Sequence, residues 1–189
     1  MTNDAGATPP RTPGARQLPE ALSPARVADL LGSTCALVEA EVRALGDDEA
    51  RWHPAEGEWC VNEVLGHIIE AEKRGFAGRI RRIIDEDRPT FDPWDQQAVA
   101  KERHDCDRMA LSVFMEWMGI RHSSVEMVRA LRPEQLDRAG VHRKVGELRV
   151  RDLIQEWVHH DREHTKQLLS IVQARAWPHM ANAQKFADD

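Results

Sequence analysis

Four long runs of helical periodicity constrain the fold of this chain more than any other feature. Apolar residues recur at steps of three and four over residues 24–45, 61–87, 99–131 and 150–174, and this spacing places them on one face of an α-helix. No segment shows the period-two alternation of a half-buried strand. We therefore predict an all-α protein that folds as a four-helix bundle.

The breaks between the runs agree with this prediction. Ser23 and Pro24 have the order of a helix N-cap followed by a proline in the first turn. Segment 88–98 holds two prolines and two aromatic residues and interrupts the helical period. We expect a long crossover between the second and third helices at that point, and a polar loop over residues 137–146.

The length of 189 residues fits one domain with ragged ends. Residues 1–20 hold four of the ten prolines and almost no large apolar side chains, so they cannot offset the entropy lost on ordering. We predict a flexible leader over 1–20, the bundle over 21–176 and a C-terminal tail over 177–189.

Composition excludes several classes of function. A net charge of −6 gives no basic surface for nucleic acid, and no window approaches the roughly 18 apolar residues of a membrane span. The three cysteines, Cys35, Cys60 and Cys106, include no C-x-x-C pair, so neither a disulfide framework nor a cysteine-based zinc site is expected. We expect a cytoplasmic protein that binds neither nucleic acid nor membrane.

Two histidines lie inside the apolar stripe of the last helix. His160 and His164 are one turn apart on this stripe, and His67 shares a face of the second helix with Val64 and Ile68. A buried polar group left unpaired costs about 1–3 kcal/mol, and one metal ion would provide a partner for all three imidazoles. His67, His160 and His164 are therefore the candidate ligands of a divalent transition metal, with zinc or nickel expected first and a position left open for water or substrate.

Other readings of the histidines stay open. Each could be a core residue satisfied by hydrogen bonds, and His159 lies on the flank of the stripe, five residues from His164. Glu63 and Asp161 could orient the imidazoles through hydrogen bonds, although a solvated position is commoner for such residues. The remaining histidines are expected to be solvated: His53, His104, His122, His142 and His179.

Residues 160–164 also fit the H-x-x-E-H pattern of inverzincin metallopeptidases, in which the glutamate activates water. Such enzymes are much larger proteins with a glutamate ligand well downstream. This chain has no glutamate after Glu163, so we disfavour a peptidase.

Two motifs resemble a known family. The segment EWCVNEVLGHI (58–68) is similar to the EWSxxEVLGHL signature of the DinB/YfiT-like superfamily, and WVHHDREHTKQL (157–168) is similar to its W-x-x-H-D-x-x-H-x-x-Q-I last helix. They occur in the family's order and separation, and the resemblance covers about residues 24–174. It implies a four-helix bundle with a metal bound by His67, His160 and His164.

The resemblance also bears on activity. Family members include thiol-dependent S-transferases, a mycothiol-dependent isomerase and damage-inducible proteins without a known reaction. Segment PTFDPWD (89–95) is similar to the P-x-I-x-P-Y-D link of the S-transferase-like members. We expect a homodimeric, metal-dependent enzyme that transfers a low-molecular-weight thiol to a small electrophile, with a hydrolase or a non-catalytic stress-response binding module as alternatives.

Two residues near the motifs have open roles. Cys60 stands where the family usually has a serine helix cap, and we expect a buried inert thiol rather than a redox-active one. Trp94, in the crossover, either packs simply or closes a pocket over the metal. Trp117 and Trp157 fall on core stripes.

Overall fold

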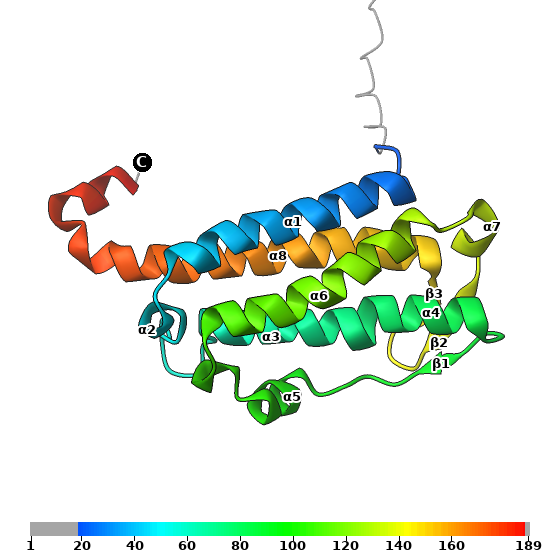
Figure 1. Ribbon diagram of the computed structural model, residues 1–189, viewed down its shortest axis with the longest axis horizontal. Helices are drawn as coiled ribbons and strands as arrows, with labels where there is room; N and C mark the ends of the chain where they lie inside the picture. The colour runs from blue at the N-terminus through cyan, green and yellow to red at the C-terminus, as the bar shows by residue number, and fades with distance from the viewer. Residues whose placement is uncertain (1–18, 188–189) are drawn as a thin grey trace, which may run out of the picture.

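The computed structural model describes residues 19–187, and most of this part of the chain is helical (Figure 1). The helices are α1 (Pro24–Ala44), α2 (Asp47–Ala50), α3 (Val61–Glu70), α4 (Ala77–Asp85), α5 (Gln96–Arg103), α6 (Ala110–Arg129), α7 (Pro133–Leu136) and α8 (Val150–Ala176). A π-helical turn, Ala71–Phe76, joins α3 to α4, and 3-10 turns cover Asp105–Asp107, Trp177–His179 and Ala181–Ala187. None of the described helices has the length and apolar character needed to cross a bilayer.

Four long elements form the bundle. Helix α1 packs on α6 and α8, and α3 packs on the same two helices, so α1 and α3, the first two long helices of the chain, lie diagonally across the bundle. Helices α1 and α8 run in one direction, whereas α3–α4 and α6 run in the other (Figure 1). The long crossover after α4 makes this order possible, because it returns the chain to the end of the bundle where α3 begins. The four-helix bundle predicted from the sequence is confirmed.

The ends of the first, second and fourth predicted helices match the structure closely. Ser23 caps α1 by accepting a hydrogen bond from the backbone N–H of Arg26, and Pro24 occupies the first turn. The third predicted helix, 99–131, is wrong in its first part. His104 adopts a left-handed backbone conformation with φ of 51° and ends α5, so the bundle helix α6 begins only at Ala110.

A small sheet is a second correction, because no strand was predicted. Strands β1 (Thr90–Phe91), β2 (Ala139–His142) and β3 (Gly146–Arg149) pair in the order β1-β2-β3, parallel and then antiparallel. They are too short to show an alternating pattern. Gly140 is required there, since a β-carbon at this position would collide with the Phe91 ring and the Pro89 carbonyl.

The bundle core divides into two apolar clusters with a polar layer between them. One cluster joins the start of α1 to α4 and the first half of α8, and the other joins the end of α1 to α3, the start of α6 and the second half of α8. Trp157 and Trp117 are fully buried in the first and second cluster respectively, as predicted. The buried polar residues between the clusters are Thr34, Glu72, Arg121, Ser124, Asp161 and Thr165.

The predicted domain boundaries stay predictions. Of the leader over residues 1–20, only the last two positions lie within the described residues. The described part of the final segment, residues 177–187, leaves the bundle as the 3-10 turns that follow α8 (Figure 1).

Candidate metal centre

Three imidazoles meet between α3 and α8. The Nε2 atoms of His67 and His160 are 3.1 Å apart, and one nitrogen of each of His67, His160 and His164 lies within 4.8 Å of the other two. Two nitrogens bound tetrahedrally to one zinc ion would lie about 3.3 Å apart. The spacing of the two Nε2 atoms therefore suits shared coordination.

Burial keeps two of these rings neutral. Together with a smaller effect of the neighbouring His164, it lowers the pKa of His67 to about 4 and that of His160 to about 3. Neutral imidazoles have the free nitrogen lone pair that a metal needs. The Nδ1 atoms of His67 and His160 are buried without a hydrogen-bond partner among the described residues. The neutral rings and the short distance between their Nε2 atoms fit a cluster whose Nε2 atoms are directed toward a shared ion.

The third imidazole has a partner that fixes its orientation. Nδ1 of His164 lies 2.8 Å from Oε1 of Gln167. A carboxamide oxygen only accepts, so Nδ1 carries the proton and Nε2 is left for the metal. Gln167 belongs to the last-helix motif, but the sequence analysis assigned no role to it. Its position three residues after His164 is the sequence signal that could have indicated this contact.

The carboxylates considered as orienting groups do something else. Glu63 accepts from the backbone N–H of Cys60 and lies 3.1 Å from His53. Asp161 forms a buried ion pair with Arg121. Neither hydrogen bonds to His67, His160 or His164, so this alternative is wrong.

Aromatic rings cover the centre. The Trp94 ring stacks on His67 at a centroid distance of 6.1 Å, and Trp59 lies 5.1 Å away. Phe76, from the π-helical turn, meets His160 edge-on at 5.1 Å. The crossover thus brings Trp94 onto a candidate ligand, as the pocket-closing interpretation expected.

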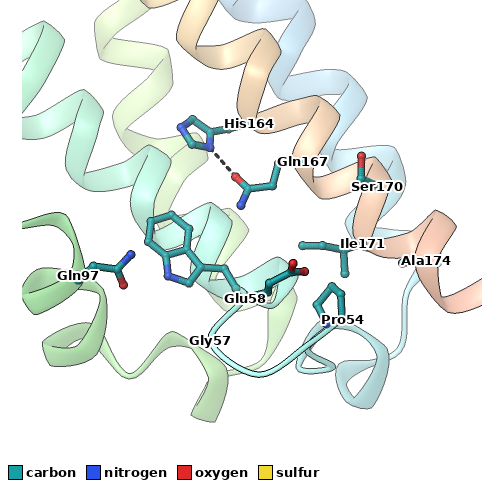
Figure 2. Close-up of a pocket in the computed structure, with 10 residues that line it drawn as sticks. Pro54, Gly57, Glu58, Gln97, His164, Gln167, Ser170, Ile171 and Ala174 are labelled. Atoms are coloured by element: carbon teal, nitrogen blue, oxygen red, sulfur yellow. Dashed lines mark hydrogen bonds between the residues drawn. The ribbon is translucent and has the colours of Figure 1, made fainter.

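Two cavities border the three imidazoles. His164 lines a cavity of about 620 Å³, in which α8 provides Gln167, Ser170 and Ile171 along one wall (Figure 2). His67 and His160 line a separate cavity of about 210 Å³. Each cavity is thus bordered by part of the three-histidine centre.

The polar layer between the two apolar clusters is linked to the centre through Asp161, which follows His160 in α8. Glu72 lies in the π-helical turn and accepts from the Trp117 indole N–H and from the Arg121 guanidinium. Arg121 also pairs with Asp161, the residue after His160, and the two carboxylates raise its pKa although burial lowers it. A π-helical turn at this place is in keeping with its frequent occurrence at functional sites.

The other histidines divide as predicted, with one exception. His159 is exposed near Glu163, outside the cluster, and Glu163 pairs with Lys166 at the surface. His104, His122 and His179 are exposed, and so is His53. The prediction for His142 is wrong, because its ring is buried beside the smaller cavity.

The cysteines are a further correction. Cys60 and Cys106 form a disulfide, and only Cys35 is a free thiol. Spacing in sequence gave no sign of this pair, since the two residues are 46 positions apart and meet only because the crossover packs on the start of α3. The interpretation of Cys60 as an inert thiol is therefore wrong.

The fold and the three imidazoles define a four-helix-bundle protein with a metal-binding three-histidine centre. The chain belongs to the DinB superfamily, whose family model matches residues 31–168. The matched range contains His67, His160 and His164.

Individual relatives agree with this membership. A protein of Oceanobacillus iheyensis is 26% identical over 123 residues, or 65% of this chain and 70% of its own length. One of Bacillus mycoides is 24% identical over 122 residues, or 64% and 69%. Both carry the name "Putative metal-dependent hydrolase". The structure of YfiT from Bacillus subtilis, described as having "an unusual four-helix bundle topology", matches with a TM-score of 0.75 and 16% identity over 87% of this chain and 95% of that one.

Proposed function

We infer that this protein is a metal-dependent enzyme that transfers a low-molecular-weight thiol to a small electrophile. The observation that supports this is the pair of cavities, one lined by His164 and the other by His67 and His160. A transferase joins two organic substrates, whereas hydrolysis needs only one beside water. Two approaches to one centre therefore favour transfer.

The three imidazoles determine what a bound metal ion would contribute to the reaction. A divalent ion held by the three imidazoles would act as a Lewis acid and lower the pKa of the thiol that it binds. His67, His160 and His164 would hold this ion, and the contact with Gln167 keeps Nε2 of His164 free to bind it. The thiol sulfur then forms a bond to the electrophilic carbon, the leaving group departs with its electron pair, and the thiol proton passes to solvent.

The cavity walls suggest which substrate occupies which side. Arg79, Lys144 and Glu156 line the smaller cavity, and because the two cations outnumber the one carboxylate, this wall suits the carboxylate groups that small thiols such as cysteine derivatives carry. The larger cavity has Trp59 and Ile171 in its wall, which suits a less polar electrophile. We assign the thiol to the first cavity and the electrophile to the second.

An assay of the metal-loaded protein tests this proposal. Zinc- or nickel-loaded protein is mixed with a panel of small thiols and a chromogenic electrophile, and formation of the thioether is followed. We expect turnover that is lost in His160→Ala together with stoichiometric metal. His159→Ala is the matched control, because its imidazole is exposed and outside the cluster. Turnover that survives His160→Ala, or that His159→Ala abolishes equally, contradicts the proposal.

Hydrolysis is the second candidate, and the names of the two relatives favour it. The same three imidazoles would serve, with water in place of the thiol. Amide and ester substrates, assayed with and without added thiol, separate the two functions. Hydrolysis that is independent of thiol would favour the hydrolase.

A homodimer in the cytoplasm is proposed for the assembly and location. Leu111, Met115 and Met118 leave a partly exposed apolar stripe along α6, and burying such a stripe against a second copy would be favourable. Light scattering after size exclusion measures the assembly. A monomeric mass at micromolar concentration would contradict the homodimer.

A further inference from the structure

A second group of metal-ligating side chains lies at the start of α3. It consists of His53 in the link after α2, Cys60 and Glu63 at the first turn of α3, and Cys106 in the 3-10 turn after α5. One donor atom from each of the four side chains lies within 4.8 Å of the other three. Three separate segments of the chain therefore converge on one point.

The two donor distances that involve His53 match a tetrahedral zinc site, whereas the sulfurs of Cys60 and Cys106 are joined as a disulfide and must separate before both can bind one ion. Sγ of Cys106 is 3.7 Å from Nε2 of His53, and the corresponding edge of a zinc tetrahedron is about 3.6 Å from ordinary Zn–S and Zn–N bond lengths. Nε2 of His53 is 3.1 Å from Oε2 of Glu63, close to the about 3.3 Å expected for two light donor atoms. Two sulfurs, one imidazole and one carboxylate form a donor set that zinc accepts.

The surroundings also suit thiolates at this place. Cys60 is fully buried and is the N-cap residue of α3, where the helix dipole and the free N–H groups stabilise negative charge. His53 is exposed at the rim, so an ion can enter from solvent. Cys35, the free cysteine, belongs to no such group among residues 19–187.

We propose that His53, Cys60, Glu63 and Cys106 form a second metal site, which binds zinc when the Cys60–Cys106 disulfide is reduced. Two molecules of a small thiol reduce the disulfide: their sulfurs become one new disulfide, and their two hydrogens pass to Cys60 and Cys106. Binding of Zn²⁺ then releases two protons as the thiols become thiolates. The reverse oxidation by a small disulfide expels the ion.

This site is distinct from the three-histidine centre but borders its approach. Cys60 precedes His67 by seven residues of α3, or about 10 Å along the helix axis. The link between His53 and Cys60 contains Gly57 and Glu58, which line the larger cavity. Either the disulfide or the bound metal ion would therefore restrain the same wall of the cavity. The inference does not rest on the proposed enzymatic activity.

Cobalt binding tests the proposal, because thiolate ligands give Co²⁺ an intense charge-transfer absorption in the near ultraviolet that imidazole ligands do not. The full chain, purified without metal, is titrated with Co²⁺ after reduction by a phosphine and, separately, in its oxidised form. We expect the reduced chain to bind one more ion than the oxidised chain and to gain the charge-transfer band. Equal stoichiometry without the band in the reduced chain overturns the proposal.

Variants assign the band to its ligands. Cys60→Ser with Cys106→Ser should lose the additional ion and the band, whereas Cys35→Ser, the matched thiol control, should keep both. His53→Ala should preserve the fold, because it changes an exposed side chain. It should lower the metal affinity of the second site by more than about tenfold, the loss typical when only an outer-sphere partner is removed. His67→Ala should leave the band intact. A band that persists without Cys60 and Cys106, or that is lost with His67 alone, overturns the assignment.

Discussion

Nδ1 of His164 and Oε1 of Gln167 lie 2.8 Å apart, one turn of α8 from each other. Because the amide oxygen can only accept, this contact holds the proton on Nδ1 and directs Nε2 toward His67 and His160. It is the one hydrogen bond that the described part of the chain gives to the imidazoles from outside their own group. The geometry of the third ligand therefore depends on a side chain that does not itself bind the metal.

Replacing Gln167 by alanine should weaken metal binding without unfolding the bundle. Loss of such an orienting partner typically costs about 10–100-fold in metal affinity, because the imidazole is then free to rotate and to change its tautomer. Competition with a chromogenic chelator measures the affinity. Gln173→Ala, an exposed position on the same helix, is the control. Equal affinities of the two variants would contradict the role given to Gln167.

The stability of the metal-free protein should fall as the pH is lowered from about 6.5 to about 4. Burial lowers the pKa of His67 to about 4 and that of His160 to about 3, whereas histidines of an unfolded chain titrate near 6.5. Within this window the unfolded chain binds more protons, so the free energy of unfolding rises with pH and is lost on acidification.

Urea denaturation at a series of pH values, after removal of metal by a chelator, measures this loss. His67 alone should account for a loss on the order of 3 kcal/mol across the window. His67→Gln should flatten the profile, and His159→Gln, at an exposed position, should leave it unchanged. An unaltered slope in His67→Gln would show that the buried imidazole is not responsible.

Gly66→Ala should destabilise the protein by about 1–3 kcal/mol. A β-carbon at position 66 would collide with the carboxylate of Asp105, which Arg103 and Arg108 hold in place by ion pairs. Gly119→Ala is the matched control, because nothing lies near its β-carbon position in α6, and alanine there should stabilise by about 0.5–1 kcal/mol. Thermal denaturation compares the two, and the same sign of change in both would refute the steric argument.

The sequence predicted the helices whose buried apolar residues recur with helical periodicity. The runs that became α1, α3–α4 and α8 have apolar residues on one face over many turns, and their ends carry ordinary signals such as Ser23 and Pro24. The third run failed because α5 and α6 are both helical and a single residue, His104 with φ of 51°, separates them. A left-handed histidine has no signature in an apolar pattern.

Helical periodicity also made the candidate centre predictable, but only for the residues that lie on the regular helices. His67, His160 and His164 stand on core-facing stripes, so helix geometry brings them together. Contacts that depend on the crossover could not be derived. Cys106 reaches Cys60 only through the path of the chain after α5, and this path depends on many loop dihedral angles that no local pattern determines.

Arg121→Met should cost about 3–5 kcal/mol in the free energy of unfolding. Arg121 is 2% exposed and is the buried cation that pairs with both Glu72 and Asp161. Its loss leaves two carboxylates in an apolar setting without their cation, and the cost of burying such charges exceeds what the added methionine packing returns. Arg129→Met, on the same helix, removes a surface ion pair with Asp29 and should change stability by less than about 1 kcal/mol. Since Asp161 follows His160, we also expect metal affinity to fall in Arg121→Met and to be unchanged in Arg129→Met. Similar urea midpoints for the two variants would mean that the polar layer contributes no more to stability than an exposed ion pair does.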